Sequence, residues 1–271
     1  MSPPSIGVAL VTGTSSGSDY ASGLVEPVYF PIIGLARTVF ALQGLKFTVT
    51  GDDNIPAAGG AVIAINHTGY MDFTYAGLPA RTHKRYIRFM AKKEVFDNSI
   101  SGPIMRSLKH IPVDRSAGAD SYREAVARLK SGELVGVYPE ATISRSFEIK
   151  EFKSGAARMA LEADVPIIPI VIWGAQRVWT KGFPKRLGRT NTPIAIKVGE
   201  PIQPYEPASA LTEQLHSTMQ EMLLDVQRDY PHEVGAYWVP ARLGGSAPTL
   251  EEANAMDMAE AAEKAAKRSQ G

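Results

Sequence analysis

From residue 45 onward, short apolar runs alternate with stretches whose apolar residues recur at helical spacing. The runs predict buried strands at Phe47–Val49, Ala61–Ile65, Ile87–Ala91, Ile111–Val113, Leu134–Tyr138, Val165–Trp173 and Ile194–Val198. The stretches between them predict helices at Tyr70–Leu78, Ser121–Leu129, Gly155–Ala163 and Leu211–Val226. Strands separated by helices indicate an α/β sheet with helices packed on it, whose functional groups gather at the carboxyl ends of strands.

Two flanking segments differ from this central domain, which we place at residues 45–244. In the N-terminal segment, 1–44, the first 23 residues are rich in Ser, Gly and Pro, which predicts a disordered or loosely attached start. Residues 25–45 are apolar but broken by prolines and an arginine, which favours a helix lying in a membrane interface over one crossing the bilayer. A buried core helix is the alternative. Residues 245–271 predict a surface or frayed helical tail, because Thr249 and Glu252 have capping-box spacing and few large apolar residues follow.

Composition narrows the function classes. The 271-residue chain is 44% hydrophobic and 21% charged, as expected of a globular protein with a sizeable core. It has no cysteine, which excludes disulfides, thiolate catalysis and cysteine-based zinc sites. The net charge of +1 provides no overall field for nucleic acid, which we do not predict as a partner. Basic residues are concentrated at 81–93 and 181–189, either as solvated loops or as surfaces for anionic lipid headgroups or a phosphorylated cofactor.

Residues 66–72, NHTGYMD, directly follow the predicted strand Ala61–Ile65. A histidine at a strand end and an aspartate five residues later, across a turn into a helix, can face each other. His67 and Asp72 would then supply a base and the group that orients it. Histidine is suited to this role because its unperturbed pKa lies near neutrality. A buried histidine bonded to a carboxylate is common, so this pair alone is weak evidence of catalysis.

Five later segments strengthen the catalytic interpretation of His67 and Asp72. They are AKKEVF at 91–96, IPVDR at 111–115, VYPEAT at 137–142, FKSGAAR at 152–158 and VPIIP at 165–169. Together with NHTGYMD, their order and spacing resemble the lysophosphatidic acid acyltransferase (PlsC-type) family of glycerolipid acyltransferases. The resemblance covers roughly residues 45–205. It implies a mixed, largely parallel sheet flanked by helices, and makes residues 45–244 an acyltransferase domain.

The resemblance implies transfer of a fatty acyl group from acyl-CoA or acyl carrier protein to the sn-2 hydroxyl of lysophosphatidic acid, giving phosphatidic acid. His67 would be the general base and Asp72 would orient it and stabilise the imidazolium. The thioester donor is already activated, so no acyl-enzyme is required. Backbone N–H groups near the helix start after Asn66 are the expected donors to the oxyanion. We predict no bound cofactor and, for want of metal-ligand spacing, no metal.

The second and third motifs of the family bind the acceptor's glycerol and phosphate, which implies this role here for Asp114, Arg115, Glu140 and Thr142. Arg115 suits a phosphate clamp because guanidinium bonds phosphate in a bidentate way, although a salt bridge with Asp114 is the alternative. Lys153 is a further candidate cation. The third motif departs from the usual Glu-Gly-Thr-Arg: alanine and Ile143 replace the glycine and the arginine. We therefore expect Arg145 as a substitute, or a different acceptor.

The fourth motif is apolar, so Pro166 and Ile168 are predicted either to line an acyl channel or to belong to a core strand. The other histidines (His83, His110, His216 and His232) lack motif support and are interpreted as surface or core residues.

Other activities stay open at this stage. One alternative is an acyltransferase of the same family with another lysophospholipid or glycolipid acceptor. A second is a thioester hydrolase that uses His67 and Asp72 to activate water, and a third is a non-catalytic lipid-binding protein. The predicted location is the cytoplasmic face of the cell membrane, held peripherally, in phospholipid biosynthesis. The sequence does not predict an oligomeric state.

Overall fold

The computed structural model describes residues 29–114 and 118–269. The predicted loose start at residues 1–23 therefore lies outside the described residues. The strands are β1 (Lys46–Thr50), β2 (Ala61–Ile65), β3 (Ile87–Lys92), β4 (Ile111–Val113), β5 (Leu134–Val137), β6 (Ile167–Trp173) and β7 (Pro193–Val198). The helices are α1 (Tyr29–Gln43), α2 (Asp72–Ala80), α3 (Lys93–Asp97), α4 (Ser101–Ser107), α5 (Gly118–Lys130), α6 (Gly155–Ala163), α7 (Ala208–Arg228) and α8 (Leu250–Ser269).

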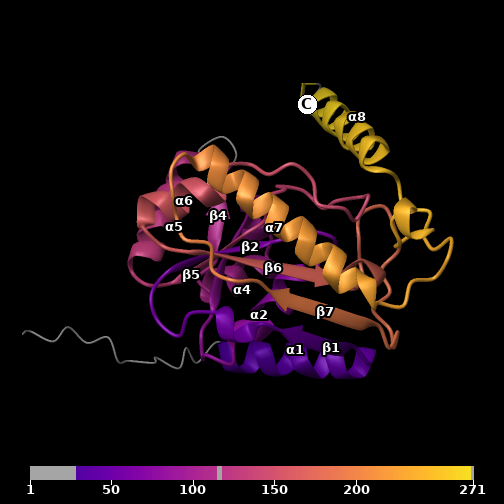
Figure 1. Ribbon diagram of the computed structural model, residues 1–271, viewed down its shortest axis with the longest axis horizontal. Coiled ribbons are helices and arrows are strands. Elements are labelled where there is room, and N and C mark those ends of the chain that lie inside the picture. The colour runs from indigo at the N-terminus through magenta and orange to yellow at the C-terminus, as the bar shows by residue number, and fades with distance from the viewer. Residues whose placement is uncertain (1–28, 115–117, 270–271) are drawn as a thin grey trace, which may run out of the picture.

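The described strands form one seven-stranded sheet in the order β1-β7-β6-β2-β5-β3-β4 (Figure 1). Neighbouring strands pair in parallel, except that β6 and β7 pair antiparallel. The sheet is therefore mixed and largely parallel with helices on both faces, which confirms the predicted fold class. The middle of the sheet is completely covered, since every residue of β2 is 0% exposed. That burial explains why β2 reads as a continuous apolar run.

Successive side chains of β2 point to opposite faces and so separate two hydrophobic clusters. Val62 and Ala64 pack with residues of α5, α6 and α7 on one face of the sheet. Ile63 and Ile65 pack on the other face with residues of α1 and α2. The helices thus form two layers around the sheet, and burial of their apolar faces is the main stabilising contribution.

The helices differ from the predicted ones in two details. The helix predicted from Tyr70 begins two residues later, at Asp72, because residues 66–71 form the turn that leaves β2. The region after β3 contains two further helices, α3 and α4, which are shorter than any of the predicted ones. Pro103 lies in the first turn of α4, where a missing backbone N–H costs no helical hydrogen bond.

The helix α1 is amphipathic in its packing. Phe40 is buried against the sheet, whereas Leu35 and Leu42 are 66% and 70% exposed. Its first residue, Tyr29, donates a 2.7 Å hydrogen bond from its hydroxyl to the carbonyl of Leu108, just after α4. None of the helices in the described ranges combines the length and apolar character that crossing a bilayer requires.

The C-terminal helix α8 extends away from the two helical layers (Figure 1). Its start is capped as the sequence predicted. The Thr249 hydroxyl accepts a bond from the Glu252 N–H (3.2 Å), and the Glu252 carboxylate accepts one from the Thr249 N–H (2.8 Å).

Candidate active site

The turn between β2 and α2 brings His67 and Asp72 together. Nδ1 of His67 lies 3.1 Å from Oδ2 of Asp72. The Asp72 side chain is 0% exposed, whereas that of His67 is 19% exposed. A hydrogen bond from Nδ1–H to the carboxylate leaves Nε2 as the nitrogen with a lone pair, on a ring that solvent reaches. The pair therefore has the geometry of an oriented general base.

Asp72 is held rigidly by the turn that it closes. Its Oδ2 accepts hydrogen bonds from the backbone N–H groups of Thr68 (2.8 Å) and Gly69 (2.9 Å) as well as facing His67. It is also the first residue of α2, where the N–H groups of the first turn favour a negative charge. Three donors on one oxygen keep the carboxylate in place for His67.

Contacts with the neighbouring strand β6 and with the residues that follow it fix the position of the turn. The Asn66 side chain donates to the Ile172 carbonyl (3.0 Å) and accepts from the Ile172 N–H (2.7 Å), so it prolongs the pairing of β2 with β6. Gly69 passes close to the backbone beyond β6: a Cβ there would lie 2.9 Å from the Trp179 carbonyl oxygen. The Thr180 hydroxyl donates to the Thr68 carbonyl (2.7 Å). A side chain at position 69 would push this turn away from β6.

Glu140, which follows the end of β5, supports the same turn through hydrogen bonds. Its carboxyl oxygens accept from the backbone N–H groups of His67 (2.8 Å) and Lys150 (3.2 Å). Burial raises its pKa to about 8; the two N–H groups and the charge of Lys150 oppose this rise, and Asp72 adds to it. Only 5% of Glu140 is exposed. Both oxygens bond the main chain, which makes Glu140 a brace for His67; its role as an acceptor ligand stays a prediction.

Tyr138 is a site residue that sequence reasoning missed. Its ring stacks on the His67 imidazole with centroids 4.0 Å apart and planes 19° apart. It precedes Glu140 by two positions in the VYPEAT motif, so its place at the end of a strand was the available signal. Because β2 and β5 are parallel neighbours, His67 and Tyr138 leave the sheet at the same edge, as expected for an α/β site.

Four of the backbone N–H groups after Asn66 already have acceptors, which narrows the choice of oxyanion donors. The backbone N–H of His67 donates to Glu140, and those of Thr68 and Gly69 donate to Asp72. The N–H of Tyr70 donates to the Trp179 carbonyl at 3.0 Å. These four amides hold the turn together, so an oxyanion donor from the main chain would have to lie nearer the start of α2.

The third motif continues into a cluster of cations. Lys150 donates to the Thr142 hydroxyl (3.0 Å) and to Asp257 of α8 (2.6 Å). Arg145 pairs with Asp257 and Glu260 of α8 at 3.1 and 2.8 Å. The sequence predicted Thr142 and Arg145 as acceptor ligands but assigned α8 no contact with the site. Ile143, at the position where the family usually has arginine, is 6% exposed and so faces the protein interior.

The other predicted acceptor residues are dispersed. Asp114 pairs with Lys93 at 3.3 Å on an exposed surface. Lys153 is exposed, and its backbone N–H donates to the Pro139 carbonyl (2.9 Å), which keeps it beside the third motif. Arg115 lies outside the described residues. The roles of these three residues in acceptor binding stay predictions.

The fourth motif lies at the far end of the sheet from His67. Ile168 pairs with Ile63 across β6 and β2, and Pro166 comes before β6 begins. Since β2 and β6 are parallel, both residues lie toward the amino ends of the strands. Ile168 is 0% exposed inside a hydrophobic cluster. This favours the core-strand interpretation of Ile168 over the acyl channel.

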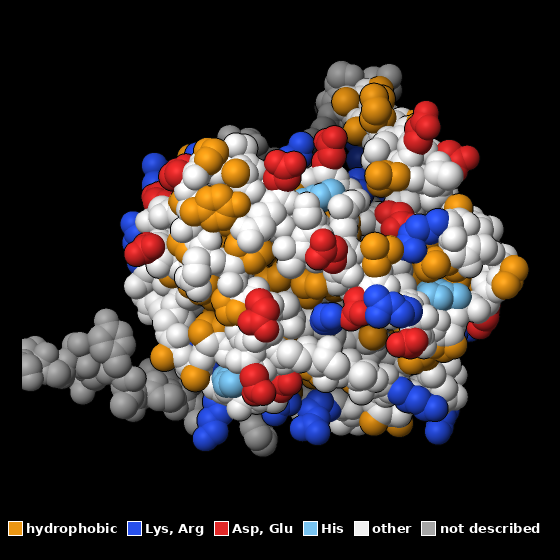
Figure 2. Space-filling model, in the orientation of Figure 1, with side chains coloured by type: hydrophobic (Ala, Val, Ile, Leu, Met, Phe, Trp, Pro, Cys, Tyr) orange, Lys and Arg blue, Asp and Glu red, His pale blue; other side chains and the backbone are white. Residues whose placement is uncertain are grey.

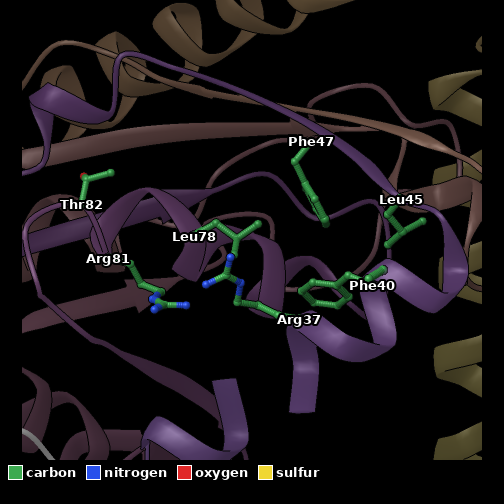
Figure 3. Close-up of a pocket in the computed structure, with 8 residues that line it drawn as sticks. Arg37, Phe40, Leu45, Phe47, Leu78, Arg81 and Thr82 are labelled. Atoms are coloured by element: carbon green, nitrogen blue, oxygen red, sulfur yellow. The ribbon is translucent and has the colours of Figure 1, made fainter. Parts of the chain in front are cut away.

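Two surface cavities lie away from the His67 turn. One, of about 520 Å³, is formed by α1, β1 and the end of α2. Arg37 and Arg81 lie beside Leu78 there, and Phe40 lies on the other side of Arg37 (Figure 3). Asp72 is at the opposite end of the same helix. The other, of about 550 Å³, includes Asp114 of the second motif among its lining residues. Acidic and basic side chains are interspersed on the face in Figure 2, in agreement with the net charge of +1.

Of the remaining histidines, His110 is clearly structural. It is buried and its Nδ1 accepts a hydrogen bond from the Phe89 N–H at 3.1 Å. Burial, with help from the Arg88 charge, lowers its pKa to about 4. Over residues 29–114 and 118–269, no group of three or more His, Asp or Glu side chains is arranged to hold a metal ion.

Comparison with known proteins identifies the family. Residues 46–173 match the family model described as Acyltransferase, and this range contains the His67 turn, the third motif and β6. The chain therefore contains an acyltransferase-family domain. This confirms the family and the enzyme class that the sequence motifs predicted.

Named relatives agree with this assignment. A 1-acyl-sn-glycerol-3-phosphate acyltransferase of Bacillus subtilis is 29% identical over 198 residues, 69% of this chain and 92% of the relative. One from Limnanthes alba is 34% identical over 182 residues, 65% of this chain and 60% of the relative. The crystal structure of the lysophosphatidic acid acyltransferase PlsC from Thermotoga maritima has a TM-score of 0.61 at 23% identity, covering 74% of this chain and 80% of that one. This structural match shows that the chain shares the PlsC fold.

Proposed function

We propose that this acyltransferase moves a fatty acyl group from acyl-CoA or acyl carrier protein to the sn-2 hydroxyl of lysophosphatidic acid, with His67 as general base. The 3.1 Å contact between His67 Nδ1 and the buried carboxylate of Asp72 carries the proposal. The names of the relatives from Bacillus subtilis and Limnanthes alba, both 1-acyl-sn-glycerol-3-phosphate acyltransferases, support this choice of acceptor. This reaction would place the enzyme in phospholipid biosynthesis.

The reaction needs one proton transfer in each direction. Nε2 of neutral His67 takes the proton from the acceptor hydroxyl as its oxygen attacks the thioester carbonyl carbon. The carbon–sulfur bond then breaks, and the imidazolium returns the proton to the departing thiolate. Asp72 keeps Nδ1 protonated in the resting state and stabilises the positive ring that forms between the two steps. The Tyr138 ring limits rotation of the imidazole through their stacking contact.

Product analysis tests this assignment. Purified protein is mixed with oleoyl-CoA or palmitoyl-CoA and lysophosphatidic acid, and lipids are identified by mass spectrometry. Phosphatidic acid should form, and His67→Ala should abolish it. Thioester loss at the same rate without any acceptor would identify a hydrolase and contradict the proposal, because an acyltransferase has to exclude water from its site.

Burial of Ile143 supports a second candidate function. An isoleucine facing the interior cannot bind phosphate, so an acyltransferase that uses another lysophospholipid or a glycolipid fits this position. The same assay with a panel of lysolipids separates the two candidates. Faster turnover of an acceptor without a phosphate monoester would favour the second.

We propose that α1 holds the enzyme on the membrane surface, at the cytoplasmic face. Leu35, Val39 and Leu42 are exposed and follow each other at helical spacing, with Arg37 between them. Such a face suits insertion at the level of the lipid headgroups. Sedimentation with anionic vesicles tests it: Leu35→Ser with Leu42→Ser should weaken binding, and the exposed Val234→Ser should not.

A further inference from the structure

Three cations from two segments of the chain converge on the acidic face of α8. Lys150 and Lys181 donate to Asp257 at 2.6 and 2.9 Å, and Arg145 joins them at 3.1 Å. Lys181 also lies 2.6 Å from Glu260. The three cationic side chains are 13–19% exposed and the two carboxylates 16% and 26%. This cluster, Arg145, Lys150 and Lys181, therefore surrounds a pair of negative charges.

Each cation of the cluster is adjacent to a group that holds the His67 turn. Arg145 follows Ser144, whose N–H donates to the His67 carbonyl at 2.7 Å. Lys181 follows Thr180, whose hydroxyl donates to the Thr68 carbonyl. The backbone N–H of Lys150 itself donates to Glu140, which holds the His67 N–H. The cations are thus fixed to the same turn as the base.

The helix that supplies the counter-ions is weakly packed. Among the α8 residues whose side chains are described, Ala253 is fully buried, while Met256 and Met258 are 44% and 74% exposed. Ion pairs and not apolar burial therefore hold this part of α8 against the body. Partly exposed ion pairs contribute little individually and are weakened by salt, so another anion can compete for these cations.

The charges also fit a particular ligand. A phosphate monoester carries up to two negative charges and several acceptor oxygens, as do the two carboxylates together. Arginine and lysine are the residues that bind such groups, and Lys150 additionally contacts the Thr142 hydroxyl of the third motif. Displacing Asp257 and Glu260 would open an anion site fixed to the His67 turn.

We propose that Arg145, Lys150 and Lys181 bind the phosphate monoester of the acceptor, and that Asp257 and Glu260 of α8 occupy this site until the acceptor displaces them. This rests on the proposed acylation of lysophosphatidic acid. In this arrangement α8 competes with the acceptor for the same site. The three cations take the place of the arginine that the family usually has at position 143.

The test removes the resident charges in the full-length chain. D257N/E260Q should lower the KM for lysophosphatidic acid about three- to tenfold, since more of the enzyme is competent to bind it. Its kcat and its KM for oleoyl-CoA should not change. The control is E251Q/E263Q, which makes the same change in net charge on the same helix; Glu263 pairs with Lys267 and not with the cluster. An unchanged KM for lysophosphatidic acid in D257N/E260Q overturns the proposal, and so does a lower KM for oleoyl-CoA alone.

A binding measurement separates this inference from the proposed function. In the inactive His67→Ala background, calorimetry compares glycerol 3-phosphate binding with and without D257N/E260Q, and tighter binding supports the site whether or not lysophosphatidic acid is the substrate. Equal tightening for inorganic phosphate would assign the site to free phosphate and overturn the assignment to the acceptor. If D257N/E260Q left glycerol 3-phosphate binding unchanged while the enzyme acylated lysophosphatidic acid, the inference would be contradicted and the proposed function would still hold.

The cations provide an independent check. Lys181→Met should weaken glycerol 3-phosphate binding about tenfold, since one of three charges on the phosphate is lost. Lys185→Met, four residues later on the same loop and stacked on Trp179, is the control. Equal effects of the two substitutions would contradict the assignment of Lys181. Thermal unfolding of each variant shows whether it is folded.

Discussion

The His67 turn and the α8 contact are both parts of the site, but different forces hold them. The turn is held by hydrogen bonds among buried groups, most of them to the main chain. The α8 contact is held by ion pairs between partly exposed side chains. Buried hydrogen bonds are costly to leave unmade, whereas partly exposed ion pairs are replaced by water and salt at little cost. The proposed mechanism therefore combines a rigidly held base with a counter-ion that can exchange.

The largest effect should come from the carboxylate that orients the base. Asp72→Asn can keep an oxygen facing the Thr68 and Gly69 amides and His67 Nδ1, but it loses the negative charge that stabilises the imidazolium. We expect kcat to fall by about 10²- to 10⁴-fold with little change in fold, the range that general acid–base catalysis contributes. Steady-state kinetics and circular dichroism measure the two quantities. The exposed Asp53→Asn is the control, and a kcat within tenfold of the unaltered enzyme would remove Asp72 from the mechanism.

Glu140 tests whether the turn depends on buried hydrogen bonds. In Glu140→Gln one oxygen becomes an NH₂ group that faces the Lys150 N–H, which should lower the unfolding free energy by about 1–3 kcal/mol. Urea denaturation measures it, with the exposed Glu151→Gln as control. Equal stability of the two variants would show that the brace is unimportant.

The stability difference between the unaltered protein and Glu140→Gln should depend on pH. The pKa of Glu140 is raised by burial to about 8, well above its ordinary value of 4.5, so its stabilising contribution is present when the carboxyl is protonated. That contribution is lost as pH rises through about 8. Glutamine does not ionise, so the stability difference between the two proteins should narrow from pH 5 to pH 8. A difference that widens over this range would contradict the sign.

Tyr138 gives a smaller effect. Its buried hydroxyl has no hydrogen-bond partner among the described residues. Tyr138→Phe should therefore keep kcat and leave the unfolding free energy unchanged or up to about 1 kcal/mol higher. Tyr138→Ala removes the stacking on His67, worth about 0.5–1.5 kcal/mol, and should lower kcat about three- to tenfold. If phenylalanine were as harmful as alanine, the hydroxyl and not the ring would matter.

The smallest effect concerns α8 alone. Raising NaCl from low concentration to about 0.5 M should speed amide exchange in α8, since ion pairs of this kind contribute about 1 kcal/mol or less each. The amides of Thr68 and Gly69 should keep their protection. Hydrogen exchange followed by mass spectrometry compares the two regions in one sample. Equal salt sensitivity of both would remove the distinction between them.

Low pH should also weaken the contact between α8 and the cations Arg145 and Lys181. Hydrogen bonds from Lys181, Lys264 and Arg145 lower the pKa of Glu260 to about 2. A depressed pKa means that its stabilising contribution is present above its ordinary value of 4.5 and is lost as pH falls toward 2.

Much of the site was predictable because it is local or follows from strand order. His67 and Asp72 are five residues apart across one turn, so a strand followed by a helix is enough to bring them together. Glu140 and Tyr138 join them because β5 lies beside β2 in parallel. The bonding of the amides at 67–70 was not predictable, because each depends on partners that packing alone selects. The oxyanion prediction therefore could not separate these bonded amides from those nearer the start of α2.

The sequence by itself determined the alternation of strands and helices, the pairing of His67 with Asp72, and the motifs that define the family. These depend on periodicity and short spacing, which act within a few residues. The tertiary structure alone decided that Glu140 braces the main chain, that Ile143 faces inward, and that α8 lies on the cations. The ion pairs from Arg145 and Lys150 to α8 span 107 to 115 residues. Pairing over such distances is set by how whole elements pack, which no local pattern records.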